Sequence, residues 1–325
     1  ADGSEQRRTG QVLQAAADFE ASTTQPRASS GDAPEDEMAS MATRMRTTAE
    51  KLLQEAERLA SGRSSIAIGS PTTIRLPDGA VRNETRAELW RGPFVYTLLY
   101  SQTVEADGTK HRSQWHFGSG LGMVGPSLRN WYDAGFFDLV VNGVSLDAYT
   151  PVLDTVTQDG LERLRVRWDT DAGEVAVLLV PTLDGGLELR GAITPRGELQ
   201  SARIELFAIP SAGWGDWEDM DKAVVTPNGT VGHGTPITLK PGEKWLFFLD
   251  QAYDVPHPEA EGPCAVVFRD PVPAAITTDN GRYVVVTQAD LAPGQRQFDL
   301  IVYDFHGLTN QEALDYFHGL VKAGN

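Results

Sequence analysis

The residue types best suited to binding or catalysis gather in the segment SAGWGDWEDMD at residues 211–221. Its two indole rings could stack on the apolar faces of sugars, while its carboxylates could accept hydrogen bonds from hydroxyl groups or act as acid and base. The alternative is a loop capped by its own carboxylates, with one tryptophan in the core. The candidate sugar-binding residues of this segment are Trp214, Asp216, Trp217, Glu218 and Asp219.

The same carboxylates could hold a cation. Dense oxygen ligands suit calcium, and the calcium position would lie near Asp216, Asp219 and Asp221, although their spacing differs from that of an EF-hand loop. No other cofactor is predicted. The histidines give no metal-binding spacing, because His111 and His116 are five residues apart and would face opposite sides of a strand.

A second group of candidates lies in KHRSQWHFGSG at 110–120 and in RNWYD at 129–133. Lyase chemistry on a uronic acid polymer needs a cation that neutralises the carboxylate, a base for the neighbouring proton and a donor for the leaving oxygen. In the alternative interpretation the aromatic residues belong to the core or its rim. The candidates are His116, Arg129 and Tyr132 for catalysis and Trp131 for substrate binding.

Three arginines alternate with apolar residues in LERLRVRWDT at 161–170. This period of two is typical of a half-buried strand, with the arginines on its outward face. The basic stripe could line a groove for an acidic polysaccharide. Equally, it could be a solvated face paired with acids on neighbouring strands, such as Glu188 and Glu205. The arginines, all candidate substrate-binding residues, are Arg163, Arg165 and Arg167.

Composition narrows the class of partner. The 325 residues carry a formal charge of −17, which argues against nucleic acid or an anionic membrane as the main partner. No apolar run is long enough for a membrane span.

The single cysteine, Cys264, excludes an internal disulfide, and the chain opens with Ala1, as a protein does after removal of a signal peptide. We therefore expect export, to a bacterial periplasm or the exterior.

The chain is expected to have two parts. Residues 1–63 should form N-terminal helices joined by a polar linker at 21–37, and apolar residues at helical spacing predict an amphipathic helix over 38–61. That helix either docks on the rest of the chain or pairs with a protein partner. Residues 64–325 should form an antiparallel β-sandwich that ends in a short helix, because many alternating runs follow one another with turn residues between them.

Three segments carry a family resemblance: WYDAGFFDLVVNG at 131–143, ARIELFAIP at 202–210 and TLKPGEKWLFF at 238–248. With the succession of long strands, they resemble the β-supersandwich of galactose mutarotase-like proteins, a fold that also occurs in polysaccharide lyases and glycoside hydrolases. The resemblance implies a large sandwich and carbohydrate as the ligand. The histidine-containing motifs of aldose epimerases have no counterpart here.

Two hypotheses of function follow. In the first, the protein is an exported carbohydrate-active enzyme, a polysaccharide lyase or glycoside hydrolase, with an open groove across the sheet. In the second, it is a glycan-binding or scaffold module without catalytic activity. A titratable pair inside a cleft favours the enzyme, whereas a flat binding face favours the module.

Overall fold

The computed structural model describes residues 43–48, 50, 62–110, 119–211, 219–257 and 260–323. The chain divides into two units, residues 1–55 and residues 56–325. In the first unit, residues 43–48 and 50 are helical, within the helix predicted over 38–61. The predicted linker at 21–37 lies outside the described residues. Within the described part of the chain, no helix combines the length and apolar character that crossing a membrane requires.

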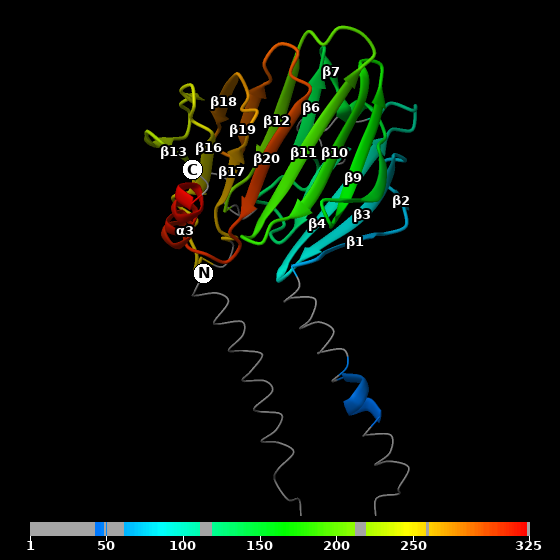
Figure 1. The fold of residues 1–325 in the computed structure, drawn as a ribbon, viewed down its shortest axis with the longest axis horizontal. Helices are drawn as coiled ribbons and strands as arrows, with labels where there is room; N and C mark the ends of the chain where they lie inside the picture. The colour runs from blue at the N-terminus through cyan, green and yellow to red at the C-terminus, as the bar shows by residue number, and fades with distance from the viewer. Residues whose placement is uncertain are drawn as a thin grey trace, which may run out of the picture. The chain divides into compact units, whose positions relative to one another are not determined.

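The second unit contains two antiparallel sheets, shown in Figure 1. We call the 11-stranded one sheet A. Its order is β1-β3-β4-β5-β6-β12-β19-β18-β15, with β2 added beside β3 and β7 beside β6. The bounds are β1 (Ser64–Ile68), β2 (Thr72–Arg75), β3 (Val81–Arg91), β4 (Phe94–Val104), β5 (Ser119–Gly125), β6 (Phe137–Val141), β7 (Val144–Ser145), β12 (Ala202–Ala208), β15 (Ile237–Thr238), β18 (Ala275–Asn280) and β19 (Val285–Asp290).

The 9-stranded sheet is sheet B, with the order β14-β13-β16-β17-β20-β11-β10-β9-β8. A short 3-10 helix, η1 (Leu146–Ala148), precedes its edge strand β8. The bounds are β8 (Val152–Gln158), β9 (Leu161–Thr170), β10 (Gly173–Pro181), β11 (Gly186–Pro195), β13 (Lys222–Thr226), β14 (Gly229–Gly232), β16 (Trp245–Asp250), β17 (Cys264–Phe268) and β20 (Gln297–Asp304).

Strand alternation builds the main core between the sheets. In β9, Leu164, Val166 and Trp168 are buried and join a cluster that includes residues of both sheets. Their neighbours on the strand point to the opposite face of sheet B, as the period of two requires. The predicted mainly β fold, an antiparallel sandwich with a C-terminal helix, is confirmed.

A second core forms where α3 (Asn310–Ala323) covers part of the outer face of sheet B. The helix begins with a capping box, since Glu312 N donates to Thr309 Oγ1 over 3.2 Å and Thr309 N donates to Glu312 Oε2 over 3.2 Å. Phe317 is fully buried against aromatic rings of the sheet, including Phe247 and Tyr303. The helix thus leaves the outer positions of β8, β9 and β10 uncovered.

Candidate functional site

The uncovered part of sheet B carries its outward side chains in rows that run across the strands. One row, which we call the charged row, follows directly from the strand register. In it, two arginines stand on either side of one leucine, and each arginine has an aspartate on its far side. From β8 to β20 the members are Asp154, Arg165, Leu178, Arg190 and Asp299.

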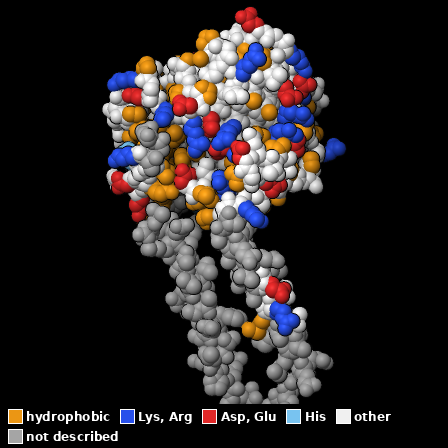
Figure 2. All heavy atoms as spheres, in the orientation of Figure 1, with side chains coloured by type: hydrophobic (Ala, Val, Ile, Leu, Met, Phe, Trp, Pro, Cys, Tyr) orange, Lys and Arg blue, Asp and Glu red, His pale blue; other side chains and the backbone are white. Residues whose placement is uncertain are grey.

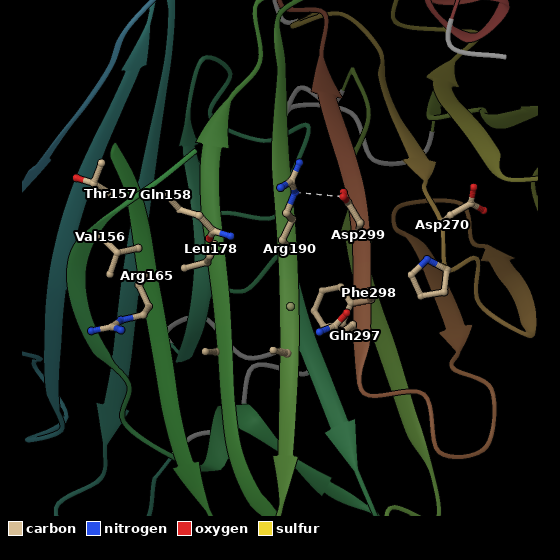
Figure 3. A pocket seen from close by; sticks show the side chains of 14 residues that line it. Val156, Thr157, Gln158, Arg165, Leu178, Arg190, Asp270, Gln297, Phe298 and Asp299 are labelled. Carbon is tan, nitrogen blue, oxygen red and sulfur yellow. Dashed lines mark ion pairs between the residues drawn. The ribbon is translucent and has the colours of Figure 1, made fainter. Parts of the chain in front are cut away.

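The next row is low in its middle, and we call it the alanine row. It runs from Val152 and Arg167 through Ala176 and Ala192 to Gln297. Two methyl groups between longer side chains leave a hollow, which is an open groove of about 640 Å³ bordered by both rows (Figure 3). A second hollow, of about 520 Å³, lies farther along the same strands over Arg167 and Thr194.

The arginines of the groove are held by carboxylates. Arg165 donates from Nε and Nη2 to the two oxygens of Asp154, over 2.7 and 2.5 Å. Such a two-point pair fixes the plane of the guanidinium group. Arg167 is held more loosely, because its Nη1 lies 3.9 Å from Glu174 Oε2.

Glu188 forms the centre of the network at one end of the groove. Its side chain is 8% exposed, and Arg163, at 3%, places Nη1 2.5 Å from Oε1. Arg190 Nε also lies 3.0 Å from Oε1, and Arg269 Nη1 lies 3.0 Å from Oε2. The three guanidinium groups supply enough donors for a carboxylate that has lost most of its water.

Asp299 is the second carboxylate of this network. Its Oδ2 lies 3.2 Å from Arg190 Nε, and its Oδ1 lies 3.9 Å from Arg269 Nη1. Burial raises the pKa of Asp299, and the charge of Glu188 raises it further, whereas Arg269 and Arg190 lower it. Two carboxyl groups in unlike surroundings therefore share the same arginines.

The arginines and carboxylates of this face form what we call the paired set. Figure 2 shows the two kinds of side chain intermingled in the middle of the face. Asp159 completes the set, with Oδ2 3.7 Å from Arg190 Nη1. The members are Arg163, Arg165, Arg167, Arg190 and Arg269 with Asp154, Asp159, Glu174, Glu188 and Asp299.

The predicted arginine stripe is thus partly the lining of two hollows and partly a packed network. Arg165 and Arg167 line the hollows, whereas Arg163 is buried under Glu188. Pairing with Glu188 agrees with the alternative interpretation of the stripe. Pairing with Glu205 is wrong, because Glu205 lies on β12 in sheet A, which is not a neighbour of β9.

Two of the predicted catalytic residues, Arg129 and Tyr132, belong to a different part of the molecule. Tyr132 donates its backbone N–H to Phe207 O of β12, in sheet A. Its side chain is mostly buried, and burial raises the pKa of its phenol, with a smaller increase from Asp133. Arg129 donates its backbone N–H to Glu261 Oε2 over 3.0 Å. The third predicted residue, His116, lies outside the described residues, so the predicted triad stays a prediction.

The structure does not support a stacking role for Trp131. The residue has 0% exposure, makes edge contacts with Phe136 and Phe248, and donates from Nε1 to Tyr303 O over 3.0 Å. An indole enclosed on all sides offers no face to a sugar ring. Trp131 is a core residue that joins the two sheets.

Most of the predicted loop site lies outside the described residues, namely Trp214, Asp216, Trp217 and Glu218. Asp219 is exposed, and Asp221 Oδ1 lies 2.8 Å from His233 Nδ1. Gln251 Nε2 donates to the other oxygen of Asp221 over 2.9 Å. Among the residues that the structure describes, no three His, Cys, Asp or Glu side chains converge on one point. The calcium position stays a prediction.

A buried ion pair follows this loop. Lys222 Nζ lies 2.8 Å from Asp250 Oδ2, and both side chains are 0% exposed. Lys222 also donates to Pro210 O over 2.5 Å, while Asp250 Oδ1 accepts from the backbone N–H of Tyr253 over 3.1 Å. Burial lowers the pKa of the Lys222 ammonium group, although Asp250 raises it. The pair ties three chain segments together, and it has no exposed surface for a ligand.

Sequence reasoning named Glu188 as a possible partner of the arginine stripe but missed Arg190 and Asp299, which complete the groove. Glu188 and Arg190 alternate with leucines in LELRGAI at 187–193, so both point outward beside the stripe. Asp299 alternates in the same way in the run that begins at Phe298. The alternation of charged and apolar residues is visible in each strand. The order of the strands, which brings the residues together, cannot be predicted from that alternation.

Comparison with known proteins gives one kind of similarity. No family model matches the chain, and none of the curated proteins matches it. Among solved structures, that of a putative aldose 1-epimerase from Klebsiella pneumoniae subsp. pneumoniae MGH 78578 has a TM-score of 0.41 and 9% sequence identity. The match covers 80% of this chain and 95% of that chain. The fold itself is given by the two sheets described above.

Proposed function

We propose that the protein binds a glycan in the open groove on the outer face of sheet B. The observation that carries this proposal is the charged row, which places two arginine–aspartate pairs on either side of Leu178. Guanidinium groups donate to sugar hydroxyls and carboxylates accept from them, while the aliphatic floor suits the C–H face of a sugar ring. The openness of the groove suits a chain that enters and leaves along the surface.

The test is a binding measurement with a matched pair of variants. Arg165→Gln removes a charged donor at the groove, and Arg203→Gln removes one from a similar pair on sheet A, where Arg203 Nε lies 2.7 Å from Asp290. In affinity gels with a panel of polysaccharides, we expect the parent and Arg203→Gln to be retarded equally. Arg165→Gln should bind about tenfold more weakly, since hydrogen bonds to charged groups are worth about 1.5–3 kcal/mol. Equal retardation of all three proteins would contradict the proposal.

A second candidate function, glycoside hydrolysis, is favoured by one observation. Asp299 lines the groove and shares Arg190 and Arg269 with Glu188, so two carboxyl groups lie close together there, and burial raises the pKa of Asp299. The expected result is release of reducing ends by the parent and loss of that release in Asp299→Asn, even at polymer concentrations that saturate the variant. Binding without product release in the parent would leave the protein a glycan-binding module.

We propose four further properties, each with its own test. Export to the periplasm or exterior is tested by fractionating the producing cells. Lyase activity at Tyr132 is tested by the ultraviolet absorbance of unsaturated products from uronic acid polymers. Calcium near Asp216, Asp219 and Asp221 is tested by calorimetry with CaCl₂. A protein partner for the 38–61 helix is tested by measuring the mass of the full chain in solution.

A further inference from the structure

The charges of the groove nearly cancel. The paired set contains five arginines and five carboxylates, so its formal charge is zero, within a chain whose total is −17. Asp270, which also lines the groove, adds one negative charge. The face is therefore less negative than the rest of the molecule, but it is not a basic patch. Sheet geometry explains why: each arginine has an acidic partner on the same strand or on a nearby strand.

Pairing decides which ligands can use these arginines. A ligand carboxylate that approaches Arg165 also approaches Asp154, whose two oxygens already occupy Nε and Nη2. It would have to displace Asp154 or remain beside a like charge, and either course costs free energy. A hydroxyl group both donates and accepts, so it can bridge an arginine and its carboxylate without displacing either.

The floor of the groove points to the same class of ligand. Leu178 lies between Arg165 and Arg190 in the register, and Ala176 lies next along its outward face. The two arginines are two strands apart, a separation of about 10 Å between backbones. A sugar ring on this aliphatic strip would have hydroxyls directed toward the pairs on both sides.

We infer that the groove selects an uncharged glycan, whose hydroxyls bridge the arginine–carboxylate pairs while its C–H faces lie on Leu178 and Ala176. This inference rests on the proposed function and adds the class of ligand. It argues against an acidic polysaccharide as the ligand of the arginine stripe. The arginines are already paired with carboxylates, and these would repel an acidic polymer.

The test compares ligands that differ only in charge. Glucans, mannans and galactans are each measured against the same polymer oxidised at C6 to the uronic acid, by affinity electrophoresis with the full chain. We expect a neutral polymer to bind and its oxidised form to bind at least about tenfold more weakly. The affinity should change less than about twofold when NaCl rises from about 0.05 to about 0.5 M, because no net charge is neutralised.

Stronger binding of the oxidised form, with steep loss in salt, would overturn the inference and leave the proposed function intact. Binding of no polymer would overturn both.

A variant that removes one carboxylate charge sharpens the result. Asp154→Asn frees Arg165 from its carboxylate, so affinity for the oxidised polymer should rise about tenfold while affinity for the neutral polymer falls. Asp290→Asn, which frees Arg203 on sheet A, serves as the control and should change neither. If Asp154→Asn leaves the preference for the neutral polymer unchanged, pairing is not its cause and the inference fails.

Discussion

Both sheets turn a nearly buried carboxylate toward their outer faces, and they satisfy it in different ways. On sheet B, Glu188 is surrounded by the guanidinium groups of three arginines. On sheet A, Asp138 accepts from Ser145 Oγ over 2.7 Å and from the backbone N–H groups of Leu139 and Leu146 over 2.8 and 3.0 Å. The first carboxylate has cationic partners, and the second has neutral ones.

The difference appears in the pKa values and in what each face can do. Burial raises the pKa of Asp138 to about 6, and the charges of Asp147 and Glu205 contribute to the increase. Glu205 is the cross-strand partner of Asp138, so this part of sheet A places two carboxylates side by side. The arginine network of sheet B borders the open groove, whereas the raised pKa of Asp138 predicts that sheet A contributes a pH dependence of stability.

Removing the central carboxylate of sheet B should have the largest effect. Glu188→Gln keeps the shape of the side chain but leaves Arg163, which is 3% exposed, without its charged partner. We expect the free energy of unfolding to fall by about 3–5 kcal/mol, the range for breaking a buried pair by removing one partner. Urea denaturation measures the change, with Glu174→Gln, from an exposed pair, as control. A loss below about 1 kcal/mol would mean that the network is as weak as a surface pair.

The corresponding change on sheet A should appear as a pH dependence. Because the folded pKa of Asp138 is raised to about 6, its stabilising contribution is present at low pH and is lost as pH rises through that value. Relative to Asp138→Asn, the parent should therefore lose up to about 3 kcal/mol of unfolding free energy between about pH 4 and pH 8. Urea denaturation across this range checks the sign. A difference that stays constant with pH would show that Asp138 does not titrate as its surroundings predict.

The smallest effects on stability are expected for the half-exposed pairs of the two faces. Arg165 with Asp154 on sheet B and Arg203 with Asp290 on sheet A have similar exposure. Arg165→Gln and Arg203→Gln should each lower the free energy of unfolding by less than about 1 kcal/mol. Thermal denaturation of both variants checks this. If Arg165→Gln is far less stable, its weaker glycan binding would reflect unfolding, and the comparison between the faces would lose its meaning.

The alternation of residue types predicted much of the fold but little of the groove. The run that contains Leu164 and Arg165 gives the strand and its two faces directly. The ion pair between Arg163 and Glu188 could also be predicted, because both residues occupy outward positions of their strands and carry opposite charges. The rejected link to Glu205 shows the limit, because no local pattern states which strands share a sheet.

The hollow itself depends on register. Ala176 and Ala192 are ordinary small residues in their own strands, and they form a floor only because they are directly opposite each other in the β10–β11 pair. A shift of one residue would turn one of them into the core. The register is set by packing between strands of the two sheets, which come from distant segments of the chain. This part of the site could therefore not be predicted from the sequence alone.

The buried Lys222–Asp250 pair makes the amino group of Lys222 a chemical reporter of unfolding. An acylating reagent needs access to a neutral amine, and in the native protein Lys222 has no exposed surface, whereas Lys240 is exposed. Labelling of Lys240 should be rapid, and labelling of Lys222 should occur only when the segments held by Pro210 O and Asp250 separate. The rate at which reagent reaches Lys222, read by mass spectrometry, would thus measure how often this end of the sandwich opens under native conditions.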